Sequence, residues 1–236
     1  LVQESATTMR ALVTGASGQL GGYLLRQLTD DGIEFSAWSG SRAGQLSGVS
    51  LEPVDLADPA RIAAAFREAR PSVVIHAGAM ASVAECYRNP GQAWQVNSQA
   101  TAVLADLAAR SATRLVFVST DLVFDGEKGS YQESDAPSPL SVYGRTKVAA
   151  ERAALSISNS VVVHVSLMYG PSLVDRPSFF DQQLAALRER RPLKLFEDEW
   201  RTPLDLPTAA QALVEIARSD YQGILHVGGP ERMSRL

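Results

Sequence analysis

The sequence predicts an α/β fold in which helices cover both faces of a parallel sheet, with a small additional lobe towards the C-terminus. Three observations predict it. Short β-branched runs alternate with helical patterns from residue 10 onward. A glycine-rich turn follows the first of these runs. The chain has 236 residues, 45% of them hydrophobic, which is enough for one sizeable core. Together these features indicate a Rossmann-type doubly wound sheet.

Seven short apolar runs are the predicted strands. The run from Ser72 to Ala77 is short and almost uniformly apolar, as expected of a strand that helices cover on both faces. In order, the strands are expected at Ala11–Thr14, Ile33–Trp38, Ser50–Val54, Ser72–Ala77, Arg114–Ser119, Val161–Leu167 and Ile224–Val227.

Helices are predicted between these strands, where apolar residues recur every three or four positions. Leu20, Leu24 and Leu28 place one face of the first helix in the core. Asp58 and Pro59 start the second helix, because aspartate caps a helix and proline suits its first turn. Further helices are expected from Asn89-Pro90 to about Arg110, from Tyr143 to Leu155 and from Phe179 to Arg190.

Two irregular stretches interrupt this alternation. Asp125–Ser141 is a long Pro- and Asp-rich loop, of the kind that carries function in compact domains. The block from Tyr169 to Pro207 is expected to form a small lobe over the carboxyl edge of the sheet, where ligands bind in open α/β folds. The predicted division is 9–168 for the Rossmann domain, mainly 169–207 for the lobe, and 208–236 for a return to the sheet.

The two ends of the chain carry expectations of their own. Met9 resembles a natural start, and residues 1–8 are left out of the fold prediction. Residues 231–235 resemble the beginning of another element, so we expect the natural protein to continue beyond them.

Charge and cysteine content exclude several classes of protein. Lys and Arg number 22 against 26 Asp and Glu, a net charge of −4, so neither a nucleic acid nor an anionic membrane surface is an expected partner. No apolar stretch approaches the roughly 18 residues of a membrane span. A single cysteine, Cys86, excludes an internal disulfide and favours a cytoplasmic setting. Cys86 itself is expected to be an ordinary helix residue.

The glycine-rich turn is the first candidate site. Its residues, from Gly15 through Ser17, Gly18, Gln19 and Leu20 to Gly21, join the first strand to the first helix. Such a turn lets the backbone approach a pyrophosphate, which the N–H groups at the start of the helix then bind. A tight turn without a ligand is the alternative, and the position in the first strand–helix unit favours a nucleotide.

The residues after the second strand bear on the choice of nucleotide. No acidic residue stands there to accept a hydrogen bond from the ribose 2′-hydroxyl of NAD. Ser39 and Arg42 suit a 2′-phosphate better, so NADP(H) is preferred and NAD(H) remains open, with a solvated loop arginine as the alternative. Asp55, after the third strand, is placed either to meet the adenine or to stabilise a turn.

Tyr143 and Lys147 form the second candidate site. They lie four residues apart on one helix face, so the ammonium can lower the phenol pKa from near 10 and also reach a ribose hydroxyl. That is what a proton donor at neutral pH requires. Thr120 ends the fifth strand, where its hydroxyl would hold a substrate carbonyl oxygen or, alternatively, a loop backbone.

These motifs resemble the extended short-chain dehydrogenase/reductases, and within them the dTDP-4-dehydrorhamnose reductase branch. The resemblance rests on the glycine turn, the block S-T-D-L-V-F-D-G at 119–126, Tyr143-x-x-x-Lys147 and M-Y-G-P at 168–171, and it covers 9–236. It implies that Thr120, Tyr143 and Lys147 are catalytic and that Asp121 assists the substrate. Arg201 is a candidate for a substrate phosphate. The cofactor contacts already named are those of the turn and Ser39, Arg42 and Asp55. The further predicted contacts are Leu56, Gly78, Ala79, Met80, Asn97, Tyr143 and Lys147.

The resemblance implies an NAD(P)H-dependent reductase of a nucleotide-linked 4-keto sugar, with a homodimer as one option for its assembly. Two alternatives stay open. The regulatory β subunit of methionine adenosyltransferase, an NADP-binding partner protein, shares the same motifs, and so do NAD-dependent sugar-nucleotide epimerases and dehydratases. His76, His164 and His226 are expected far apart in separate strands, which favours buried hydrogen bonding over a metal site.

Overall fold

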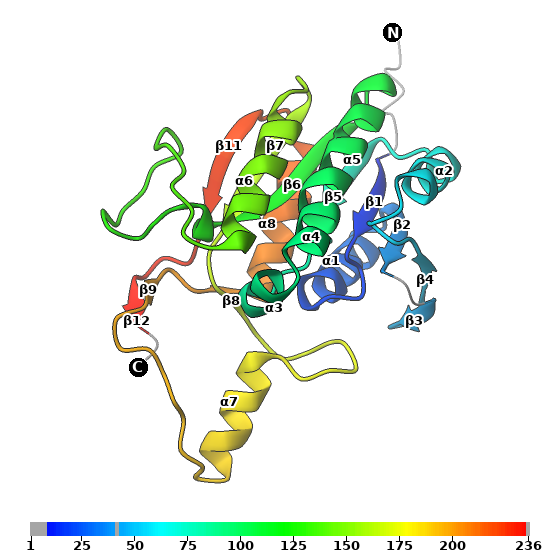
Figure 1. Cartoon of the computed structure of the whole chain (residues 1–236). Coiled ribbons are helices and arrows are strands. Elements are labelled where there is room, and N and C mark those ends of the chain that lie inside the picture. The colour runs from blue at the N-terminus through cyan, green and yellow to red at the C-terminus, as the bar shows by residue number, and fades with distance from the viewer. Residues whose placement is uncertain (1–8, 41–42, 235–236) are drawn as a thin grey trace, which may run out of the picture.

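The computed structural model describes residues 9–40 and 43–234, and an eight-stranded sheet forms its centre (Figure 1). The strands are β1 (Arg10–Thr14), β2 (Glu34–Ser39), β3 (Gly44–Leu46), β4 (Val49–Pro53), β5 (Val73–His76), β6 (Arg114–Thr120), β7 (Ser160–Val165) and β11 (Gly223–Val227). Their order is β11-β7-β6-β5-β1-β2-β4-β3, and every pair is parallel except β3 with β4. The predicted doubly wound sheet is confirmed, and β3 is an additional strand that was not predicted.

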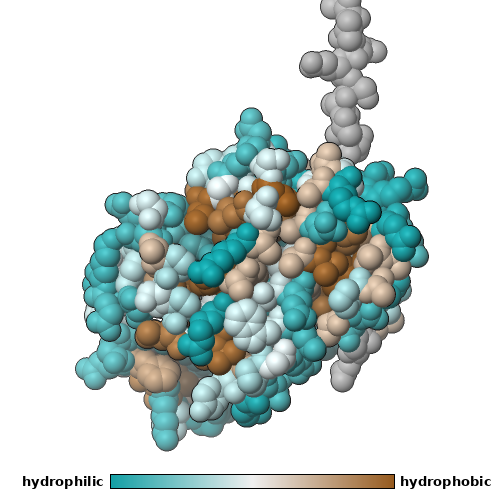
Figure 2. Space-filling model, turned by 45° about the horizontal axis from the view of Figure 1, so that its top comes forward, coloured by the Kyte–Doolittle hydropathy of each residue, from teal (hydrophilic) through white to brown (hydrophobic). Residues whose placement is uncertain are grey.

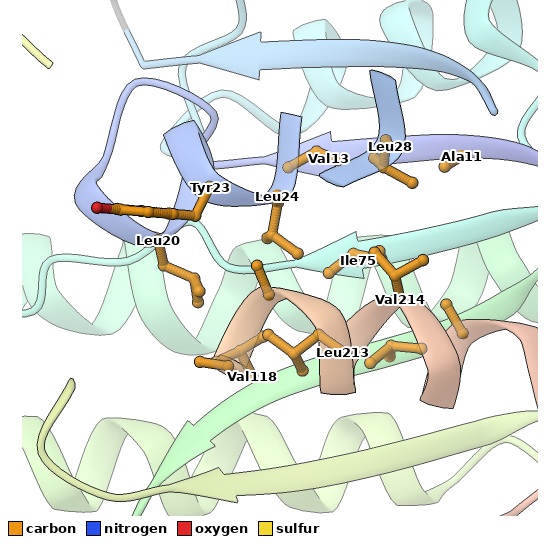
Figure 3. Close-up of a cluster of buried hydrophobic side chains, with 14 of the residues drawn as sticks. Ala11, Val13, Leu20, Tyr23, Leu24, Leu28, Ile75, Val118, Leu213 and Val214 are labelled. Atoms are coloured by element: carbon orange, nitrogen blue, oxygen red, sulfur yellow. The ribbon is translucent and has the colours of Figure 1, made fainter. Parts of the chain in front are cut away.

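Helices cover both faces of the sheet. On one face, α1 (Gln19–Asp30) and α8 (Leu206–Arg218) pack over Val13 and Ile75, as Figure 3 shows. On the other face lie α2 (Pro59–Ala69), α5 (Ala100–Arg110) and α6 (Val142–Leu155). Helix α8 was not predicted, although Asp205 caps it by accepting from the N–H of Thr208 at 3.0 Å.

Strand order places a crevice at the carboxyl ends of β1 and β5. From β1 the chain proceeds outward to β2 and β4, whereas β5 and the following strands extend in the opposite direction. Loops that leave the two neighbouring strands therefore diverge at this point, which is where ligands bind in folds of this type. The glycine-rich turn follows β1 directly, so it lies in this crevice.

The helix predicted from Asn89-Pro90 to Arg110 is not uniform. It consists of α4 (Pro90–Ala93), a π-helical segment η1 (Trp94–Gln99) and α5, and it is preceded by α3 (Val83–Arg88), a short helix that contains Cys86. Wider turns of this kind are rare and occur mostly at functional positions. This one contains Asn97.

Between β7 and α8 the chain leaves the main sheet. Strand β7 ends at Val165, two residues earlier than predicted, and β8 (Met168–Tyr169) pairs with β10 (Leu204–Asp205). Helix α7 (Phe179–Arg188) projects away from the sheet in Figure 1. β9 (Trp200–Arg201) pairs with β12 (Met233–Ser234).

The visible surface of the protein is mainly polar (Figure 2). On the face that Figure 2 presents, hydrophilic residues predominate and hydrophobic ones form separate small patches. Within residues 9–40 and 43–234, no helix combines the length and the apolar character that crossing a bilayer requires.

Candidate active site

The glycine turn brings two loops of the crevice into backbone contact. Gly15 has φ +71°, and a Cβ on it would lie 2.7 Å from the Cα of Gly78. A Cβ on Gly21 would lie 2.2 Å from the carbonyl oxygen of Gly15, so helix and turn also pack directly. Gly18 precedes α1 and offers no side chain to cap it. The start of α1 therefore presents backbone N–H groups, the arrangement that binds an anion.

Side chains around this turn divide between solvent, crevice and core. Ser17 is exposed, whereas Leu20 is 8% exposed and packs in the cluster of Figure 3, so only its backbone is left for a ligand. The Gln19 amide donates to the carbonyl of Arg176 at 3.0 Å. Its buried Oε1 has no hydrogen-bond partner in the described part of the chain. Gln19 thus carries an acceptor that a bound ligand would satisfy.

Three residues were predicted to contact the adenosine part of the cofactor, and the structure places them differently. Ser39 is 4% exposed, and its hydroxyl donates to the carbonyl of Glu52 at 3.3 Å. Arg42 lies outside the described residues. Asp55 is exposed and accepts from the N–H of Ala57 at 2.8 Å, which is the turn role considered as its alternative. Its contact with adenine stays a prediction.

The loop after β5 forms the other wall of the crevice. A Cβ on Gly78 would lie 2.7 Å from Cδ1 of Leu56, so these two predicted contacts are neighbours. Ala79 and Met80 follow, both half-buried. Gly78 is therefore tightly confined between Leu56 and the turn at Gly15.

A buried polar chain fixes this wall. The N–H of Gly78 donates to Oγ1 of Thr14 at 3.0 Å, and that hydroxyl lies 2.6 Å from Nδ1 of His76. Nε2 of His76 lies 3.0 Å from Oγ1 of Thr101, which itself donates to the carbonyl of Asn97 at 2.7 Å. Because each hydroxyl has one proton, Thr14 donates to Nδ1 and the His76 proton is on Nε2. Burial lowers the pKa of His76 to about 3, so the ring is neutral.

Asn97 acts within the protein. Its Oδ1 accepts from the N–H of Met80 at 2.7 Å, and its Nδ2 donates to the carbonyl of Met80 at 3.1 Å and to Thr146 Oγ1 at 3.0 Å. Only 1% of Asn97 is exposed. Asn97 therefore ties the crevice loop to α6, and its contact with the cofactor stays a prediction.

Thr120, Tyr143 and Lys147 come together at the carboxyl edge of the sheet, as predicted. Ser141 caps α6 by accepting from the N–H of Gly144 at 2.9 Å, which starts the helix just before Tyr143. Tyr143 hydrogen-bonds to the side chain of Thr120. The Lys147 ammonium donates to the carbonyl of Val118 at 2.7 Å.

The electrostatics of this trio differ from the prediction. Burial raises the pKa of Tyr143, Cys86 and Asp121 raise it further, and the hydrogen bond with Thr120 lowers it only in part. The expected lowering by Lys147 is wrong, since that ammonium points to Val118. Burial lowers the pKa of Lys147 to about 7. Tyr143 is thus a neutral phenol with its proton available, and Lys147 is an amine that titrates near neutrality.

Asp121 and Arg201 form an ion pair that the sequence did not reveal. Arg201 Nε donates to Asp121 Oδ2 at 2.7 Å and its Nη2 contacts Oδ1, while Nη1 lies 3.1 Å from Glu199. The Ser166 hydroxyl also donates to Asp121, at 2.9 Å. The guanidinium that was predicted to bind a substrate phosphate is therefore held beside Thr120, and a phosphate would compete with Asp121 for it.

Two cavities lie at opposite edges of the sheet. One, of about 330 Å³, is lined by Leu167, Tyr169, Phe180, Gln183 and Met233, with the Tyr169 and Phe180 rings 6.0 Å apart. It adjoins the irregular block beyond the carboxyl ends of the strands. The other, of about 480 Å³, is lined by residues that include Arg10, Arg67 and Arg70 at the amino ends of the strands, away from Thr120 and Tyr143.

The histidines are closer together than predicted. His164 and His226 are register partners on β7 and β11, with ring centroids 4.9 Å apart, because the last strand returns to the edge of the sheet beside β7. Residues 9–40 and 43–234 contain no group of three or more side chains able to hold a metal ion. Cys86 is a buried residue of α3, as expected, and packs near Tyr143.

Sequence reasoning missed Glu151, a buried carboxyl that accepts from Ser119 and lies 2.9 Å from His164 Nε2. Its spacing of four from Lys147 was the available signal.

A family model described as the RmlD substrate binding domain matches residues 9–236. The chain belongs to this family. Membership places it among the extended short-chain dehydrogenase/reductases, which are NAD(P)-dependent oxidoreductases, in agreement with the resemblance of its motifs.

The relatives of this chain include reductases and a subunit of methionine adenosyltransferase. A probable low-salt glycan biosynthesis reductase of Haloferax volcanii is 32% identical over 226 residues, 93% of this chain and 74% of the relative. A dTDP-4-dehydrorhamnose reductase of Aggregatibacter actinomycetemcomitans is 30% identical over 216 residues, 91% and 69% of the two chains. The methionine adenosyltransferase 2 subunit beta of Xenopus laevis is 29% identical over 248 residues, 100% and 72%.

Solved structures share the fold. A hypothetical dTDP-4-dehydrorhamnose reductase from Sulfolobus tokodaii superposes with a TM-score of 0.85 at 32% identity, over 96% of this chain and 78% of that one. The Bacillus anthracis dTDP-4-dehydrorhamnose reductase in complex with NADP gives 0.83 at 22% identity, over 97% and 78%. A Thermus thermophilus UDP-glucose 4-epimerase with NAD gives 0.82 at 26%, over 96% and 80%. The structural neighbours thus include one in complex with NADP and one in complex with NAD.

Proposed function

We propose that this RmlD-family protein is an NADPH-dependent reductase of a nucleotide-linked 4-keto sugar. The observation that carries the proposal is the assembly of Thr120, Tyr143 and Lys147 at the carboxyl edge, with strand β5 between β6 and the glycine turn that follows β1. A hydroxyl, a neutral phenol and an amine at such an edge are suited to protonating a carbonyl oxygen. The reductases among the relatives support the same activity.

The crevice fits a dinucleotide. Gly15 and Gly78 let the two crevice loops meet backbone to backbone, the start of α1 is without a side-chain cap, and the Gln19 Oε1 is a buried acceptor that a ribose hydroxyl of the dinucleotide would satisfy. Gly18 and Gln19 would hold the pyrophosphate, and Lys147 the nicotinamide ribose. Ser39 and Arg42 support NADP over NAD through the predicted 2′-phosphate contact.

When bound, the nicotinamide supplies a hydride to the sugar ketone. Thr120 would hold the ketone oxygen, and Tyr143 would donate a proton to it as the alcohol forms. The raised pKa of Tyr143, caused by burial, keeps the phenol protonated until that step. The hydrogen bond with Thr120 and the charge of Arg201, which both lower the pKa of Tyr143, would stabilise the phenolate that remains.

The substrate would bind between the sheet edge and the segment predicted as a lobe, residues 169–207. Tyr169 and Phe180 line a cavity there whose aromatic rings suit a nucleoside base. Arg201 is the register partner of Met233, which lines that cavity, and it pairs with Asp121 next to Thr120, so a diphosphate there would meet the guanidinium. Residues 9–168 and 208–236 would then supply the cofactor side of the same site.

An assay of NADPH oxidation with a panel of nucleotide-linked 4-keto sugars tests this function. Turnover with one of them supports the proposal. Tight NADPH binding without turnover on any of them, together with copurification of a methionine adenosyltransferase, would favour the regulatory-subunit alternative, which the Xenopus relative motivates. Interconversion of sugars with tightly held NAD would favour an epimerase or dehydratase.

Cofactor preference has its own test. Fluorescence titration with NADPH and NADH should give tighter binding of NADPH, and Arg42→Ala should remove the difference. Equal affinities in the wild-type protein would contradict the assignment to NADP.

We also propose a cytoplasmic location and a homodimer. The one cysteine, Cys86, is buried and unpaired, which suits a reducing compartment. Light scattering of the purified protein measures the assembly.

A further inference from the structure

A buried carboxyl group lies one helical turn beyond Lys147, behind the catalytic edge. Glu151 is 4% exposed on α6. The Ser119 hydroxyl donates to its Oε1, and Nε2 of His164 lies 2.9 Å from the same oxygen. Burying a carboxylate is costly unless donors or an opposite charge compensate for the lost water. The two donors supply part of that compensation.

Strand β6 and helix α6 are joined here by three polar contacts. Three consecutive positions of β6 contact three positions of α6 that are each four residues apart. The carbonyl of Val118 accepts from Lys147, the hydroxyl of Ser119 donates to Glu151, and the side chain of Thr120 bonds to Tyr143. Glu151 is therefore part of the same contact that assembles the catalytic trio.

The surroundings of Lys147 contain little other negative charge. Its ammonium lies 4.0 Å from the centroid of the Phe117 ring, on strand β6. Tyr143 and His76 are neutral at neutral pH, because burial raises the pKa of the phenol and lowers that of the imidazole. The titratable or charged groups that face this part of α6 are Tyr143 and Glu151 on the helix, His76 on β5, His164 on β7, Cys86 on α3 and the Asp121–Arg201 pair at the edge.

We propose that Glu151 is a positioning residue whose carboxylate, held by Ser119 and His164, is the counter-charge that lets Lys147 hold a proton near pH 7 beside the nicotinamide site. The pKa of Lys147 is lowered to about 7, because burial lowers it strongly and the charge of Glu151 offsets only part of that lowering. Without the carboxylate, Lys147 would be a neutral amine at pH 7. The inference rests on the proposed function only for the role of Lys147, since the charge coupling exists without a substrate.

Direct titration of the lysines tests the coupling. The chain has three, and Lys128 and Lys194 are exposed, so ε-¹³C-lysine NMR resolves one buried amine with two internal references. Glu151→Gln should lower the Lys147 pKa by about one unit or more. Glu151→Asp and Ser119→Ala keep the charge and should leave it near the wild-type value, as should Glu68→Gln on the exposed face of α2. A Glu151→Gln protein that titrates within about 0.3 units of wild type overturns the proposal.

A pH profile separates positioning from mere packing. For Glu151→Gln, NADPH affinity should fall about tenfold near pH 8 and recover as the pH falls, because acid restores the Lys147 cation. A loss that is equal at all pH values would indicate a packing role and overturn the proposal. Should Glu151→Gln fail to fold, the wild-type protein decides: a Lys147 that titrates below about pH 6 contradicts it.

The outcomes distinguish this inference from the proposed function. A shifted Lys147 pKa in a protein that reduces no keto sugar would support the coupling and refute the reductase. An unshifted Lys147 pKa in the Glu151→Gln variant of an active reductase would refute the coupling and support the reductase.

Discussion

Acidification from pH 7 to pH 5 should destabilise this protein through His76. The imidazole is 1% exposed and accepts a proton only with difficulty, since Thr14 donates to Nδ1 and the ring already carries a proton on Nε2. Burial lowers its pKa from 6.5 to about 3. Between these two values the unfolded chain binds a proton that the folded protein excludes, so stability is complete above about pH 6.5 and is lost as the pH falls towards 3.

The expected loss follows from the two pKa values. With 6.5 in the unfolded chain and about 3 in the folded protein, the free energy of unfolding should fall by about 2 kcal/mol between pH 7 and pH 5. Carboxylates with lowered pKa values, among them Asp135 and Asp181, act mainly below about pH 5. The groups that titrate in this interval are therefore the histidines and, near pH 7, Lys147, which is the same in the wild type and in a His76 variant.

Urea unfolding at pH 7 and pH 5 measures this loss. His76→Gln keeps a donor and an acceptor but does not titrate, so its stability should change by about 2 kcal/mol less than that of the wild type. His226→Gln is the matched control, because burial lowers the pKa of His226 as well but that ring is only half-buried. If wild type and His76→Gln lose the same stability, the buried-histidine argument is refuted.

Three further changes probe the catalytic edge. Tyr143→Phe removes only the phenolic oxygen, so folding and NADPH binding should persist while kcat falls by about two to four orders of magnitude; full activity would contradict the proton-donor role. Lys147→Ala should weaken both kcat and NADPH affinity, measured by steady-state kinetics and fluorescence titration, and an effect on kcat alone would argue against a ribose contact. Arg201→Ala leaves Asp121 without its guanidinium partner, in a pair whose side chains are 15% and 29% exposed. It should lower the free energy of unfolding by about 1 to 2 kcal/mol, and unchanged urea unfolding would show that the ion pair is not stabilising.

Much of the candidate site could be predicted because its signals are local. Tyr143 and Lys147 share a helix face wherever the helix lies in the fold, because four residues make about one turn. The turn at Gly15 follows a strand and precedes a helix in the sequence itself. Strand positions followed from apolar runs, and α8 was missed although Asp205 and Pro207 marked its start.

Sequence alone determined the sheet class, the glycine turn and the catalytic spacing, because each depends on neighbours within a few positions along the chain. Only the tertiary structure decided that Arg201 forms an ion pair with Asp121, 80 residues away. It alone also decided that His226 lies beside His164 and that Asn97 hydrogen-bonds to the backbone of Met80. It also decided the sign of the Tyr143 pKa shift, which spacing alone predicted wrongly. Burial and long-range contacts set that sign, and both arise only when distant segments pack together.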